Sequence, residues 1–359
     1  MTGATNEKSA KTTEIGLVLQ GGGALGAYEW GGILALFDWM NEAQSVGRKV
    51  ELQAVTGVSI GAINGACMVG AKSRDDAAAR LTALWDDFAL AGGFLSGDLA
   101  LLGVPHFYHF RPDFLTLPSW TFLYDTHALI STLRERVNFA VLNESPTVFA
   151  VTAADVKSGE LKRFGNRSVG QIKKVELIPE HILASGSLPP QFPWTVIGDG
   201  GEPHYYWDGG VIDNTPLGDA LSAFTTGDAV TRILVVMNLF PLRAELPSSF
   251  IQVNDRINQL RFGNRLLQDV ENADRISELV AIIKDLIQHA PPSVRDRGQQ
   301  SLQRYKHVKT VQILLSGDKD YAYADDFRDF SRDGIEYRRC KGYDLTKAKL
   351  TTELSDLCA

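Results

Sequence analysis

Three short glycine-centred motifs contain the residues of this sequence that could perform chemistry. In chain order they are Gly21-Gly22-Gly23-Ala24-Leu25-Gly26, Gly57-Val58-Ser59-Ile60-Gly61 and Asp208-Gly209-Gly210. Each motif is a weak signal alone, but together they offer main-chain donors for an oxyanion, a serine nucleophile and a carboxylate base. These are the parts needed to transfer an acyl group from an ester to water. The sequence therefore predicts an esterase or lipase that acts through a Ser59–Asp208 dyad.

The pentapeptide around Ser59 gains its meaning from the elements expected on either side of it. Residues 50–56 predict a strand, and residues 60–71 predict a helix of small residues. A serine on a sharp turn between strand and helix exposes its hydroxyl, and side chains at Gly57 and Gly61 would collide there. The N-terminus of the helix also favours negative charge that develops beside the serine. A chance match in a glycine-rich loop is the alternative, which this context disfavours.

The first glycine motif is the main ambiguity, because Gly21 to Gly26 also matches the dinucleotide-binding pattern G-x-G-x-x-G. A nucleotide site needs an acidic residue at the end of the second strand, whereas Glu51 lies near the start of that strand. We therefore favour an oxyanion hole formed by the N–H groups of Gly22 and Gly23 near a helix N-terminus. A tight turn without a catalytic role and a nucleotide-binding module remain the alternatives.

Asp208 is the candidate base because no histidine lies in a recognisable base motif, although an aspartate before two glycines is often only a turn. The histidines that follow it, His289 and His307, are not flanked by the small residues of a catalytic loop. His106 and His109 could be metal ligands, but no second ligand cluster supports them. We expect packed or solvated roles for all four histidines, and neither a metal nor a cofactor.

The elements that must position these motifs predict an α/β fold. Strands are expected at residues 15–19, 50–56, 147–153, 205–207, 232–238 and 308–315, and helices at 24–40, 60–71, 75–88 and 269–289. This pattern predicts a three-layer α/β/α sandwich with a mostly parallel central sheet. The helix at residues 269–289 is amphipathic, and we expect its apolar stripe to pack in the core.

The expected domain organisation has three parts. Residues 1–13 are polar and predict a disordered tail. We expect the catalytic domain at residues 14–317 and a C-terminal helical extension at residues 318–359. Within the catalytic domain, residues 94–124 are rich in aromatic side chains but not periodic, which predicts a packed cap or loop that could also serve as a lid. Residues 244–305 are expected to be a helical segment.

Composition limits the classes of partner. The formal net charge is −7, which argues against nucleic acid and against generic adhesion to anionic membranes. The three cysteines indicate neither a disulfide framework nor a paired-cysteine metal site. No apolar run approaches the length of a membrane span, so we expect a soluble, cytoplasmic protein whose contact with lipid is peripheral.

The chain resembles the bacterial patatin-like phospholipases in four blocks that follow one another with the expected order and spacing. They are the Gly21–Gly26 loop followed by Ala27-Tyr28, Gly57–Gly61, the segment from Ala184 to Pro193, and Asp208-Gly209-Gly210 followed by Asn214-Thr215-Pro216-Leu217. The resemblance implies a patatin-like α/β/α sandwich and hydrolysis of fatty-acyl esters without a metal.

The resemblance also implies roles for individual residues. Ser59 and Asp208 would form a dyad without a histidine, Gly22 and Gly23 would be the oxyanion donors, and the main chain of Ile60 would be a further donor. Family members often carry Arg or Lys directly after the glycine triplet, whereas this chain has Ala24. That departure argues against a phosphate-binding role at residue 24. It also weakens the interpretation as a phospholipase relative to that as a plain esterase. An acyltransferase or thioesterase on the same site, and a catalytically silent scaffold, are further alternatives.

Overall fold

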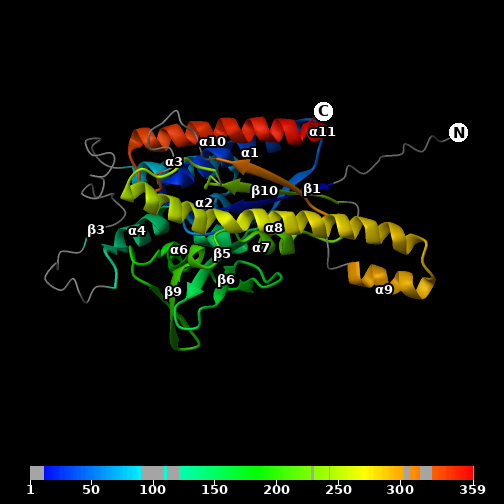
Figure 1. Ribbon diagram of the computed structural model, residues 1–359, viewed down its shortest axis with the longest axis horizontal. Coiled ribbons are helices and arrows are strands. Elements are labelled where there is room, and N and C mark those ends of the chain that lie inside the picture. Colours follow the sequence, from blue (N-terminus) through cyan, green and yellow to red (C-terminus); the bar gives the residue numbers. More distant parts are fainter. Residues whose placement is uncertain are drawn as a thin grey trace.

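A mixed, mostly parallel sheet forms the centre of the fold (Figure 1). The computed structural model describes residues 12–89, 109–110, 121–227, 230–241, 243–302, 307–315 and 326–358. The strand order across the sheet is β11-β10-β1-β2-β5-β6-β7, and β9 joins β5 and β8 beside this path. The strands are β1 (Thr12–Leu19), β2 (Val50–Gly57), β5 (Val148–Asp155), β6 (Leu161–Gly165), β7 (Lys173–Lys174), β8 (Thr195–Asp199), β9 (Glu202–Asp208), β10 (Val230–Asn238) and β11 (Lys309–Leu314). A separate antiparallel pair is formed by β3 (His109–Phe110) and β4 (Tyr124–Asp125).

The parallel part of the sheet brings the three glycine motifs to one place. Strands β11, β10, β1, β2 and β5 are parallel neighbours, so their carboxyl ends meet at one edge. Leu19 at the end of β1 pairs with Gly57 at the end of β2. Strand β9 is antiparallel to β5 and pairs Asp208 with Ala153. The loops after β1 and β2 and the end of β9 therefore converge.

Successive side chains of the central strands point to opposite faces of the sheet, and they contribute to a separate core on each face. Leu17 and Leu19 of β1 belong to the larger core, whereas Val18 belongs to the smaller core on the opposite face. The larger core is covered by α1 (Gly26–Ser45), α2 (Ile60–Val69), α3 (Arg74–Phe88), α4 (His127–Arg136), α5 (Phe139–Glu144), α6 (Pro179–Gly186) and α10 (Arg332–Glu353). The smaller core is covered by α7 (Leu217–Ala223) and α8 (Phe250–Gln288). Figure 1 shows α10 and α8 on opposite sides of the sheet, which confirms the predicted α/β/α sandwich.

Helix α8 differs from its prediction in length and in the environment of its second half. It is 39 residues long, so residues 269–289 are only its C-terminal part. That part extends beyond the sheet, where α9 (Pro292–Leu302) folds back against it (Figure 1). Leu279 and Leu286 are more than half exposed, so the expectation that the stripe packs in the core is wrong for them. Among the described residues, no helix is long and apolar enough to cross a bilayer.

The structure describes elements near the ends of the predicted domains. Strand β1 begins at Thr12, inside the tail expected at residues 1–13. Nearly all of the aromatic segment at residues 94–124 lies outside the described residues, of which it includes only 109–110 and 121–124. The expected C-terminal extension contains α10 and the short helix α11 (Ser355–Cys358), and α10 packs along α1 as part of the body.

Glycines allow α1 and α10 to approach each other closely. A Cβ atom added at Gly342 of α10 would collide with the main chain of Tyr28, and one added at Gly31 of α1 would collide with the carbonyl of Arg339. Both clashes involve backbone atoms, which cannot move without separating the helices. This close packing fixes the C-terminal helix against the helix that follows the first glycine motif.

We predict that Gly342→Ala lowers the free energy of unfolding by about 1–3 kcal/mol, because the added methyl group overpacks a helix contact made of backbone atoms. Gly218→Ala is the matched control, since its Cβ would meet open space in α7. The control should gain up to about 1 kcal/mol from its higher helix propensity. Urea unfolding of both variants measures the difference, and equal effects would contradict the proposed close packing.

Candidate active site

Ser59 lies on a strained turn between β2 and α2. Its backbone has φ 52° and ψ −123°, and no other non-glycine residue in the described ranges has a positive φ. Its N–H donates to the main-chain oxygen of Ser185 at 3.1 Å and to the hydroxyl of the same residue at 3.0 Å. Ser59 is partly exposed between the buried residues Val58 and Ile60. The turn therefore presents the hydroxyl of Ser59 at the N-terminus of a helix.

Two glycines make this turn sterically feasible. A Cβ atom at Gly61 would lie 2.6 Å from the carbonyl oxygen of Leu19 and 2.7 Å from that of Gln20. One at Gly57 would lie 2.5 Å from the carbonyl oxygen of Gly61. The first turn of α2 thus sits directly against the end of β1, as the sequence motif predicts.

Asp208 is buried beside Ser59 at the end of β9. Its side chain is 2% exposed, and its Oδ1 accepts a hydrogen bond from the N–H of Gly210 at 2.7 Å. Burial raises its pKa to about 7, and hydrogen bonds from Gly210 and from the Ser59 side chain partly oppose that shift. Gly209 is required here too, since its Cβ would lie 2.5 Å from the carbonyl oxygen of Thr152. The structure therefore brings the two predicted catalytic side chains together.

The first glycine loop lies against the serine. A Cβ atom at Gly21 would lie 2.9 Å from the Cβ of Ser59, and Gly23 has a φ of +55°, which favours glycine. Gly26 begins α1, and its Cβ would collide with the side chain of Ile60. Within the described part of the chain, no hydrogen bond occupies the N–H groups of Gly22, Gly23 and Ile60. These three groups are the predicted oxyanion donors.

Asn214 and Thr215 connect the Asp208 segment to the glycine loop. Asn214 accepts from the N–H of Gly21 at 3.1 Å and donates to the Gly21 carbonyl at 3.0 Å. The Gln20 side chain donates to Thr215 at 2.6 Å and accepts from the N–H of Leu239 at 2.8 Å. The sequence assigns no role to these side chains, although Asn214 and Thr215 lie in the fourth block of the family resemblance.

A buried polar network behind the loop was not expected from the sequence. Glu29, which is fully buried, accepts from the N–H of Gln20 at 2.7 Å and from Asn64 at 3.1 Å. Asn64 also donates to the Gly26 carbonyl at 3.0 Å and accepts from the indole N–H of Trp85 at 3.0 Å. Burial raises the pKa of Glu29 well above its usual range, against the effect of both hydrogen bonds. The network ties α1, α2 and α3 to the end of β1.

Comparison with known proteins assigns a family to this arrangement. A family model described as patatin-like phospholipase matches residues 17–221, which are more than half of the 359 residues and contain all three glycine motifs. The chain belongs to the patatin-like phospholipase family. A second family model, described as patatin phospholipase, matches residues 260–355. The family implies a lipid acyl hydrolase that acts on lipid substrates.

A search of solved structures also finds matches to this chain. One is the crystal structure of VipD from Legionella pneumophila, which is 16% identical to this patatin-like chain with a TM-score of 0.39. The match covers 95% of this chain and 67% of that chain. No curated protein sequence matches the chain.

The histidines of this patatin-like chain do not join the site where the structure describes them. Over the described ranges, no hydrogen bond links the side chain of Ser59 or Asp208 to a histidine. His106 lies outside those ranges, and His109 is described only as part of a strand. The described residues also contain no group of three or more His, Cys, Asp or Glu side chains that could hold a metal ion.

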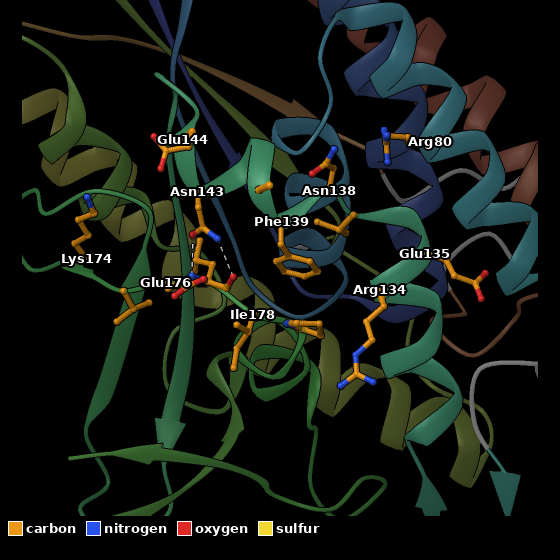
Figure 2. Close-up of a pocket in the computed structure, with 15 residues that line it drawn as sticks. Arg80, Arg134, Glu135, Asn138, Phe139, Asn143, Glu144, Lys174, Glu176 and Ile178 are labelled. Carbon is orange, nitrogen blue, oxygen red and sulfur yellow. Dashed lines mark hydrogen bonds between the residues drawn. The ribbon is translucent and has the colours of Figure 1, made fainter. Parts of the chain in front are cut away.

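A separate open hollow of about 960 Å³ lies between α4, α5 and the segment that joins β7 to α6 (Figure 2). Charges of both signs line it, including Arg134 and Lys174 as well as Glu135 and Glu176. Asn143 fixes one wall by hydrogen bonds to the main chain of Leu177 at 2.8 and 3.0 Å. None of its lining residues belongs to the three glycine motifs, so this hollow is distinct from the candidate active site.

We predict that Ser59→Gly is more stable than Ser59→Ala by about 1 kcal/mol, because glycine adopts the strained φ of residue 59 without a Cβ penalty. Both variants lack the hydroxyl, so the comparison isolates the backbone. Chemical unfolding of the pair at one pH measures the difference. A glycine variant that is less stable than the alanine variant would show that the turn is not strained.

We predict that Asp208→Asn becomes more stable relative to wild type as the pH rises. The pKa of Asp208 is about 7 in the folded state, whereas the pKa of an ordinary aspartate is 3.8, so the folded state binds this proton more tightly. The stability that the proton provides is present below pH 4 and is lost as the pH rises to about 7. Between pH 5 and pH 8 the variant should gain about 2–3 kcal/mol on wild type in urea unfolding. A difference that does not change with pH would contradict the burial effect.

Proposed function

We propose that this chain is a serine-dependent lipid acyl hydrolase in which Ser59 is the nucleophile and Asp208 is its base. The observation that carries the proposal is the pairing of a strained serine at a helix N-terminus with a buried carboxyl that accepts its hydrogen bond. Family membership supports the same class of reaction.

The proposed reaction has two steps at one site. Asp208 accepts the proton of Ser59 while Oγ attacks the ester carbonyl carbon, and N–H groups of Gly22, Gly23 and Ile60 stabilise the resulting oxyanion. The alcohol leaves with the proton from Asp208. Water then attacks the acyl-enzyme while Asp208 accepts its proton, and the free acid leaves as the proton returns to Ser59.

The environment of Asp208 supports its role as a base. An exposed aspartate is a weak base, whereas a pKa of about 7 lets the carboxylate form near neutral pH and still accept a proton readily. Removal of the base is expected to slow the reaction by a factor of about 10²–10⁴. No histidine is needed in this scheme.

The site supports ester hydrolysis more strongly than it supports the alternative functions. Strand β2 ends at Gly57 and is followed by Val58 and Ser59, so this described turn lacks the carboxylate that a dinucleotide site needs there. An acyltransferase or a thioesterase could use the same dyad with another acceptor or another acyl donor. Ala24 offers no cation for a phosphate directly after the glycine triplet, so a phosphodiester headgroup is not part of the proposal.

We predict that p-nitrophenyl esters are hydrolysed by the wild-type protein, that Ser59→Ala reduces turnover to background, and that Asp208→Asn lowers kcat by about 10²–10⁴-fold. The wild-type rate should rise as the pH passes about 7, where Asp208 loses its proton. Glu202→Gln, an exposed change on the strand that carries Asp208, is the control and should leave both properties unchanged. Substantial activity in Asp208→Asn would remove the dyad, and activity in Ser59→Ala would remove the nucleophile.

A further inference from the structure

Residues 326–331, which we call the strap, precede α10 and are fixed by a fully buried arginine. Arg338 is 0% exposed and donates to the carbonyl oxygen of Asp329 at 2.7 Å and to that of Asp326 at 3.1 Å. It also pairs with the carboxylate of Asp329, itself 1% exposed, at 3.3 Å. One guanidinium therefore holds three oxygens of the strap at once.

The strap contacts the first glycine loop through its main chain. The carbonyl oxygen of Phe327 accepts a hydrogen bond from the N–H of Ala24 at 2.8 Å. A Cβ atom at Gly23 would lie 2.5 Å from the same carbonyl oxygen, so the strap and the loop touch there without a side chain between them. The residue immediately after Gly22 and Gly23 is thus held by the C-terminal part of the chain.

The opposite side of the strap is anchored in the aromatic core. The ring of Phe330 lies 6.4 Å from that of Trp85 and 6.3 Å from that of Phe88, centroid to centroid. Ser331 caps α10 by accepting from the N–H of Gly334 at 3.1 Å. The strap is therefore a fixed support between α3, α10 and the glycine loop.

Two of the three proposed oxyanion donors, Gly22 and Gly23, lie between two clamps. Asn214 holds Gly21 on one side by two hydrogen bonds, and Phe327 holds Ala24 on the other. Glycines have many accessible backbone conformations, so Gly22 and Gly23 need such clamps if their N–H groups are to keep one direction. The N–H of Ala24 is used by the clamp and is not available to the substrate.

A buried ion pair is a poor source of stability, because the desolvation of both charges offsets most of their attraction. The Arg338–Asp329 pair contacts no residue of the candidate dyad, so its placement under the strap calls for another reason. An apolar side chain could fill the same space but could not bind three oxygens with defined geometry.

We propose that Arg338 is a positioning residue for the acyl-transfer site, which fixes the strap and thereby orients the N–H groups of Gly22 and Gly23. The proposal rests on the proposed function, because it assigns those groups to the oxyanion. It makes residues 326–338, which lie beyond the match to residues 17–221, necessary for full catalysis at Ser59.

The test compares Arg338→Met and Arg338→Lys with Arg332→Met, a matched change on α10 at an exposed arginine that pairs with Asp86. Active sites are counted by complete labelling of Ser59 with a fluorophosphonate, and kcat per labelled serine and KM are measured with a p-nitrophenyl ester. Hydrogen exchange of the peptide that contains residues 20–27 reports the loop directly. Melting temperatures report stability separately.

We expect Arg338→Met to lower kcat per labelled serine by about 10- to 100-fold with little change in KM, and to speed exchange at the hydrogen-bonded amides of Ala24 and Leu25. Arg338→Lys should show a smaller loss, and Arg332→Met none. Unchanged kcat and exchange in both Arg338 variants would overturn the proposal, even if their melting temperatures fall. If Arg338→Met does not fold, Arg338→Lys decides by the same two outcomes.

Failure of the proposed function would look different. In that case the wild-type protein itself would neither hydrolyse the ester nor be labelled at Ser59. The exchange of Ala24 and Leu25 would then decide alone whether Arg338 orients the loop: faster exchange in the Arg338 variants supports that step, and unchanged exchange overturns it.

Discussion

The close approach of α2 to the end of β1 is the constraint on which the candidate site depends. The carbonyl oxygens of Leu19 and Gln20 leave no room for a side chain at Gly61, and the turn leaves none at Gly57. With both ends of the turn pressed against backbone, Ser59 is held at a positive φ. The same approach brings the N-terminus of α2 and the first glycine loop to the serine hydroxyl, so one packing contact assembles the proposed nucleophile and the proposed oxyanion donors.

The polar groups around this contact are arranged to hold the loop in place. Gln20 uses its main-chain N–H, its side-chain N–H and its side-chain oxygen, with Glu29, Thr215 and Leu239 as partners. Buried polar networks rigidify a structure when every member is satisfied, since any rearrangement leaves an unpaired group in a low-dielectric interior. The loop after β1 therefore differs from a flexible glycine linker, although its composition resembles one.

The sequence predicts the local structure around the candidate site well because each element there is encoded by consecutive residues. The two glycines of Gly57-Val58-Ser59-Ile60-Gly61 specify a turn because they have no side chains. Strands β1, β2 and β10 are indicated by their apolar runs. Short elements such as β7 have too few residues for a period and are not predicted.

Support that acts across long sequence separations is invisible to such patterns. Phe327 contributes its main-chain carbonyl, which every residue has, so its type gives no signal. Arg338 lies in a helix with many charged neighbours, and only the fold shows that it is buried. The apolar stripe on α8 was expected to be buried but is partly exposed. Helical periodicity identifies an apolar face, but it cannot show that the helix extends beyond the sheet that would cover that face.

A dyad without histidine requires the protein to change the chemistry of an aspartate, and burial is the means that this fold offers. One carboxylate oxygen of Asp208 is engaged by the N–H of Gly210, and the hydrogen bond from Ser59 also favours the charged form. Both interactions lower the pKa, yet burial outweighs them and raises it to about 7. Because a weaker acid is a stronger base, the environment that destabilises the ionised carboxylate in the folded protein also favours the transfer of a proton from Ser59 to that carboxylate in the proposed reaction.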